Sequence, residues 1–124
     1  MGVKKANNQG LVTTTAGPDL VHDMPTAQST TVIMRKIMWY NNTGAQETLI
    51  FGTQTPAAGW VPLLPTINCV NGMDGELTEE ELLEVEFAVN SGAGAAGRTG
   101  DIMVQASAVG ILVRVEVEEV RVER

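Results

Sequence analysis

The glycine-rich loop at residues 92–99 comes nearest to a cofactor-binding motif in this sequence. Gly92, Gly94 and Gly97 have the spacing of a dinucleotide fingerprint, and Gly97-Arg98-Thr99 ends a phosphate-loop pattern with arginine in place of lysine. Both motifs require a helix directly after the glycines, because its free N-terminal amides hold the phosphates. A β-patterned segment follows instead. The glycines therefore predict a hairpin tip, and we expect no nucleotide cofactor.

The acidic segment at residues 74–86 is the candidate metal site. Part of it matches positions five, six and twelve of an EF-hand loop, but Val70 and Gly72 stand where the first and third oxygen ligands belong. Glu84 and Glu86 alternate like a glycosidase carboxylate pair, a pattern that a solvated strand face also gives. We expect a solvated acidic face and no bound metal, with an adventitious calcium site as the alternative.

The single histidine and the single cysteine do not form a catalytic group. His22 lies beside Asp23 in a polar segment that offers neither a nucleophile nor a rigid frame. Cys69 lies in a strand-like run, where a small buried hydrophobe is expected and a nucleophilic thiol is the alternative. One cysteine cannot form an internal disulfide. We therefore expect no catalytic residues and predict that the protein is not an enzyme.

Composition excludes two classes of partner. The 124 residues carry a formal net charge of −7, and nucleic-acid binding requires clustered Lys and Arg to neutralise phosphates. No apolar run is long enough for a membrane span or a signal peptide. We predict a soluble protein made in the cytoplasm, and we expect the glycosylation pattern at Asn41-Asn42-Thr43 to be a turn.

Alternating apolar and polar residues predict the fold. From Ile111 to Val117 the valines fall on one parity and the charged residues on the other, and residues 82–90 repeat this pattern. Such alternation is typical of antiparallel strands with one solvated face. Thr78 to Glu81 fits a capping box for one helical turn. We predict an all-β protein, an antiparallel β-sandwich or jelly roll of about seven to eight strands. The parity change at Glu118-Glu119 predicts a bulge there.

The first 29 residues differ from the rest of the chain. They are rich in Asn, Thr and Gly with few apolar side chains, so they are poorly suited to forming a core of their own. We predict an extended N-terminal arm at residues 1–29 that lies across a neighbouring subunit, followed by a β-sandwich domain at residues 30–124. The alternative is an N-terminal strand around residues 11–15 that packs on its own domain.

Apolar residues beyond the needs of one core predict a protein interface. The strand expected at residues 31–40 is apolar on both faces, and Pro62 and Pro65 keep the Trp60 segment from the centre of a sheet. Aromatic and Met side chains are enriched at interface centres, although core filling is the alternative. The predicted interface residues are Met34, Met38, Trp39, Tyr40, Trp60, Val61, Leu63, Leu64, Leu11 and Val12.

In overall character, the chain resembles the small β-sandwich proteins that decorate or cement virus and phage capsids. The resemblance implies a structural subunit that forms a homo-oligomer, contacts a capsid or other assembly protein, and resides in the virion. The alternative is a sandwich module whose loops bind a carbohydrate or another small ligand. Two observations would distinguish these functions: whether the indole rings of Trp39 and Trp60 face solvent in the isolated subunit, and whether they are covered in an assembly.

Overall fold

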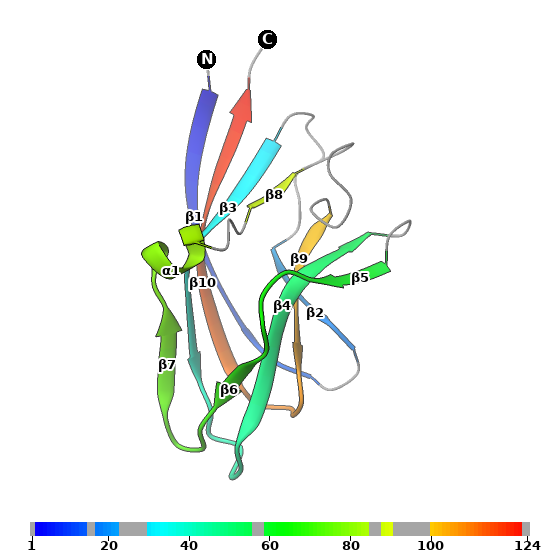
Figure 1. Ribbon diagram of the computed structural model, residues 1–124, viewed down its shortest axis with the longest axis vertical. Coiled ribbons are helices and arrows are strands. Elements are labelled where there is room, and N and C mark those ends of the chain that lie inside the picture. The colour runs from blue at the N-terminus through cyan, green and yellow to red at the C-terminus, as the bar shows by residue number, and fades with distance from the viewer. Residues whose placement is uncertain are drawn as a thin grey trace.

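Two antiparallel sheets stack face to face in the computed structural model, which describes residues 2–14, 17–22, 30–55, 59–84, 88–90 and 100–122 (Figure 1). Sheet A contains β1 (Gly2–Val12), β10 (Leu112–Val122), β3 (Thr30–Tyr40), β7 (Asp74–Leu77) and β8 (Ala88–Asn90). Sheet B contains β2 (Asp19–His22), β9 (Asp101–Ala106), β4 (Glu47–Thr55), β5 (Gly59–Pro62) and β6 (Ile67–Cys69). The predicted all-β antiparallel sandwich is confirmed. Its ten described strands exceed the predicted number because the edges are built from short pieces.

The core lies between the two sheets and follows the predicted alternation. Val113, Val115 and Val117 of β10 face inwards and are buried, while Arg114 between them is exposed. Sheet B contributes Leu49, Phe51, Ile102 and Val104 from the opposite side. Burying each of these side chains stabilises the fold by about 1.5–3 kcal/mol relative to leaving it exposed.

The described N-terminal residues, 2–14 and 17–22, contribute two strands to the sandwich instead of a separate arm. β1 pairs with β10 along its whole length, from Gly2 opposite Val122 to Val12 opposite Leu112, and β2 pairs with β9. A polar segment can do this because its backbone N–H and C=O groups pair whatever its side chains are. The boundary expected after residue 29 therefore falls inside the sandwich, and residues 23–29 lie outside the described part.

The bulge expected at Glu118-Glu119 is on the neighbouring strand instead. The register passes from Lys36 opposite Glu116 to Met34 opposite Val117, so Arg35 of β3 is the extra residue. β10 keeps its parity, and Glu119 lies on the inner face. There its carboxylate oxygen Oε1 is 3.0 Å from Nε2 of the buried His22 on β2. The sequence suggested a change of parity because a polar residue, Glu119, occupies an inward position. Its role there is a polar contact with His22 of the other sheet.

The strand expected at residues 82–90 is divided. The capping box is present, because the backbone N–H of Thr78 donates to Glu81 Oε1 and the backbone N–H of Glu81 donates to Thr78 Oγ1, and α1 (Glu79–Glu84) follows it. Leu82 of this helix is buried in the core, and the last three residues of the segment form β8. Alternation over a few residues does not distinguish a strand from one amphipathic turn of helix.

Candidate functional site

Three exposed apolar side chains form a row across the outer face of sheet A. Val12 of β1 is opposite Leu112 of β10, which is opposite Tyr40 of β3, and these residues are 54%, 51% and 39% exposed. Because successive side chains point to opposite faces, their neighbour Val113 is buried in the core. The row therefore belongs to the solvent side of the sandwich.

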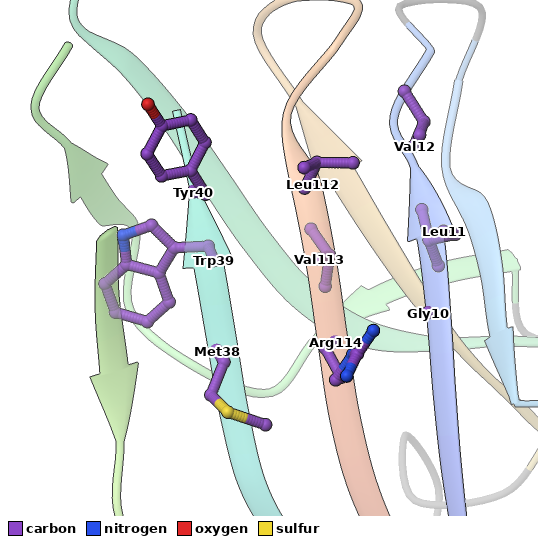
Figure 2. A pocket seen from close by; sticks show the side chains of 9 residues that line it. All are labelled: Gly10, Leu11, Val12, Met38, Trp39, Tyr40, Leu112, Val113 and Arg114. Atoms are coloured by element: carbon purple, nitrogen blue, oxygen red, sulfur yellow. The ribbon is translucent and has the colours of Figure 1, made fainter. Parts of the chain in front are cut away.

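The adjacent row deepens this surface into an open groove. Gly10, Arg114 and Met38 occupy the same three strands, next to the apolar row. The groove measures about 580 Å³ and is lined by residues 10–12, 38–40 and 112–114 (Figure 2). A Cβ atom at residue 10 would lie 3.9 Å from Arg114 Nε, an ordinary contact, so the guanidinium lies directly beside Gly10. The groove thus combines an apolar floor with one cation.

The loops at the same end of the sandwich extend the apolar surface. The backbone N–H of Asn41 donates to the carbonyl of Met73, which is 57% exposed, and the N–H of Met73 donates to Val70. On the other side, the hydroxyl of Thr13 donates to the carbonyl of Ala108, beside the exposed Val109. Six of the seven large exposed apolar side chains in the described part are at this end: Val12, Tyr40, Val70, Met73, Val109 and Leu112. We call these six residues the apolar end.

The other half of the outer face is charged and internally paired. The Arg35 guanidinium lies 2.9 Å from Glu79 of α1 and 2.9 Å from Glu118 of β10, and Lys36 lies 3.2 Å from Glu76. The bulge on β3 is what adds Arg35 to this network. The Arg35–Glu79 ion pair holds helix α1 against the sheet here, so the charged side chains already have partners within the chain, whereas the apolar row has none among the described residues.

Half of the predicted interface residues line this groove: Leu11, Val12, Met38, Trp39 and Tyr40. The other five are elsewhere: Met34 and Leu64 are buried in the core, Leu63 packs against the core, and Trp60 and Val61 lie on β5 of the other sheet. The sequence did not single out Leu112, Arg114, Val70, Met73 or Val109. The pairing of β10 with β1 and β3 brings the first two into the groove.

Trp39 is half-buried against the edge of the core and is not a free aromatic platform. It is opposite Gly75 of β7, where a Cβ atom would lie 2.4 Å from the indole ring. The ring therefore rests on the glycine backbone, with the core beside it. An exposed stacking surface for a sugar needs both a free ring face and solvent access, and the partly buried Trp39 has its ring against Gly75.

The candidate catalytic and metal-binding residues that the structure describes do not gather into one site. The described residues contain no group of three His, Cys, Asp or Glu side chains placed to hold a metal ion. Asp74 belongs to β7 and Glu81 to α1, so the partial EF-hand pattern is not one loop. The glycine-rich loop at residues 92–99 and Glu86 lie outside the described part. No described helix is long and apolar enough to span a membrane.

Cys69 is buried at the end of β6, as the sequence predicted. Burial raises the pKa of its thiol from 9.0 to about 11, and the nearby Glu47 carboxylate adds to the increase. A thiol reacts as the thiolate, so this residue is poorly reactive in the folded protein. The nucleophilic alternative is not supported.

We expect Cys69 to react with a disulfide reagent only after unfolding. At pH 8 the native protein should label at least 100-fold more slowly than the protein in 6 M guanidinium, because the folded thiol is both buried and protonated. The contribution of this thiol to stability is complete below the unfolded pKa of 9.0 and is lost as pH rises through about 11. Rapid labelling of the native protein at pH 8 would contradict the buried position.

Comparison with known proteins relates the chain to others by fold alone. No protein-family model matches it, and neither does any curated protein sequence. Among solved structures it is similar to a protein of the Bacillus endospore appendages, which form disulfide-linked pili. The TM-score is 0.53 at 10% identity, covering 99% of this chain and 89% of the other. A capsid chain of the cyanophage Pam1 aligns with a TM-score of 0.42 at 13% identity, covering 98% and 86%. The pilus protein shares the sandwich fold.

Proposed function

We propose that this protein is a non-enzymatic structural subunit that assembles with copies of itself through the groove and the apolar end. The observation that carries this proposal is the gathering of exposed apolar side chains on one half of the outer face and on the adjoining loops. Contiguous apolar surface of this kind marks an interaction site, whereas single exposed apolar residues do not.

The contact would bury the same surface on both copies. In such a symmetric arrangement Val12, Leu112 and Tyr40 of one copy pack against the equivalent residues of the other. Tyr40 is well suited to the centre, because it buries a large ring and keeps a hydroxyl for hydrogen bonding. Arg114 lies on the central strand β10 next to Leu112, so its long side chain would extend from there to the solvated rim of the contact.

The finer part of the proposal is a role in a particle, as a subunit that decorates or cements a virion capsid. It rests on the sandwich architecture, the acidic composition and the apolar surface. The fold shared with a pilus protein supports an assembly role more generally. The contact in this chain would be non-covalent, because its one cysteine is buried.

The competing function, a carbohydrate-binding sandwich, has no specific support in the described residues. Trp39 packs on Gly75, and Trp60 is half-buried on β5. Neither offers the exposed aromatic platform on which that function depends.

The test replaces one apolar residue on each sheet by lysine. We expect Leu112→Lys to weaken self-association at least tenfold, because a charge would replace an apolar side chain buried in the contact. Leu20→Lys is the matched control, since Leu20 is 49% exposed but lies on β2 of sheet B. Sedimentation velocity over a range of concentrations measures both dissociation constants.

Both substitutions are on the surface, so the melting temperatures of the two variants should stay close to that of the wild type. Equal effects of the two lysines on association would remove the apolar groove as the contact. A wild-type protein that stays monomeric at every concentration would remove the proposed function itself.

A further inference from the structure

β1 forms a long open edge of sheet A. It pairs with β10 on one side over 11 residues without a register shift, and no described strand pairs with its other side. Nothing in residues 2–12 interrupts the backbone, because the segment contains no proline. Such an edge presents a row of N–H and C=O groups that can pair with another strand.

The other described edges are short or irregular. β7 and β8 divide the opposite edge of sheet A into pieces of four and three residues. On sheet B, β5 and β6 have four and three residues, and β2 has four with a register shift. Short and bulged edges resist strand addition. β1 is therefore the described edge that offers a long template.

We propose that β1 pairs antiparallel with β1 of a second copy, joining the two A sheets into one continuous sheet. This inference rests on the proposed function, because it assumes that the chain associates with itself, but it uses a different surface. Backbone groups at the sheet edge make this contact, whereas side chains on the outer face make the other.

The lengths of the edges select β1 as its own partner. Only another β1 matches all 11 residues, since the other described edges pair over four residues at most. An antiparallel pair of this length forms about ten backbone hydrogen bonds, which is the number in a typical stable interface. Each A sheet is four strands across, because β7 and β8 share one edge, so the joined sheet would have eight strands across. This is within the usual range for an open sheet.

The two lysines of β1 select the direction of pairing. In the full-length antiparallel register, Gly2 is opposite Val12 of the second copy, Lys4 is opposite Gly10 and Lys5 is opposite Gln9. A parallel pairing in register would place Lys4 beside Lys4 and Lys5 beside Lys5, and like charges on adjacent strands are destabilising. Only Asn7 meets its own counterpart, because it is the central residue of the 11.

The experiment uses that central position. Asn7→Cys should form a disulfide-linked dimer in high yield under mild oxidation, because directly opposed residues in an antiparallel pair have Cα atoms about 4.5–5.5 Å apart. Val3→Cys is the matched control, since its counterpart would be eight positions away, about 27 Å along the strand. The native Cys69 is buried in both variants. Non-reducing gels measure the yield.

Carrying Asn7→Cys in the Leu112→Lys variant separates this inference from the proposed face contact. The cross-link should persist there, because the edge does not use Leu112. Wild-type association without a cross-link at residue 7, or equal cross-linking at residues 3 and 7, would overturn the edge pairing and leave the proposed function standing. A wild type that stays monomeric and an Asn7→Cys variant that does not cross-link would overturn both.

Discussion

The Gly52→Ala variant should be less stable than the wild type by about 3 kcal/mol or more. Gly52 of β4 is opposite Pro62 of β5, and a Cβ atom at this position would lie 2.2 Å from the carbonyl oxygen of Val61 and 2.8 Å from Cα of Pro62. Both contacts are with backbone, so no side-chain rotation relieves them. β5 would have to move away from β4. We therefore expect a loss of stability at or above the upper end of the usual range for overpacking, about 1–3 kcal/mol.

Gly10→Ala provides the matched control for this prediction. Gly10 is also a strand glycine, but a Cβ atom there would be 3.6 Å from its nearest neighbour, an ordinary contact. We expect the free energy of unfolding of this variant to differ from that of the wild type by no more than about 0.5–1 kcal/mol. Urea denaturation measures both, and equal stabilities of the two variants would contradict the close approach of β4 and β5.

The Asn41→Ala variant should lose about 3 kcal/mol of stability and loosen the apolar end. The fully buried Asn41 side chain donates from Nδ2 to the carbonyls of Ala45 and Cys69, each at 2.8 Å, and Oδ1 accepts from the backbone N–H of Thr43. Truncation removes three hydrogen bonds and leaves the buried Cys69 carbonyl without this donor, and a buried unsatisfied group costs about 1–3 kcal/mol. Met73 is held through the backbone of the same residue.

Asn42→Ala is the control, because Asn42 is the exposed neighbour of Asn41. We expect it to unfold at the wild-type urea concentration and to associate normally. If Asn41→Ala were as stable as Asn42→Ala, the hydrogen bonds of the Asn41 side chain would not be what stabilises the loop after β3. The same burial explains why the Asn41-Asn42-Thr43 pattern is not a usable glycosylation acceptor in the folded protein.

The sequence predicted the parts of the fold in which side-chain pattern and burial agree. Val113, Val115 and Val117 alternate with polar residues, and the structure buries them as expected. Most of β1 was assigned to an arm, with a strand only around residues 11–15 as the alternative, because its pairing with β10 uses backbone groups, which leave no apolar pattern in residues 2–12. Glu119 was misassigned because its inner-face position depends on His22, 97 residues earlier in the chain. Contacts between such distant residues are invisible to local periodicity.

The candidate site was predictable only in part, for a similar reason. Met38, Tyr40 and Val12 stood out as apolar residues in excess of one core. Leu112 belongs with them because it lies opposite Val12 on one side and Tyr40 on the other, a relation that strand order alone creates. The assembly role itself is still a prediction that the association experiments test.

The pairing of Gly2 with Val122 has a practical consequence for handling the protein. These two residues lie side by side at the pole remote from the apolar end, where β1 begins and β10 ends (Figure 1). In the antiparallel edge pair, however, Gly2 of one copy comes beside Val12 of the other. An affinity tag or fusion partner on either terminus would then sit next to the neighbouring molecule's apolar end and obstruct it. Assembly measured on tagged protein would be underestimated, and removal of the tag should restore it.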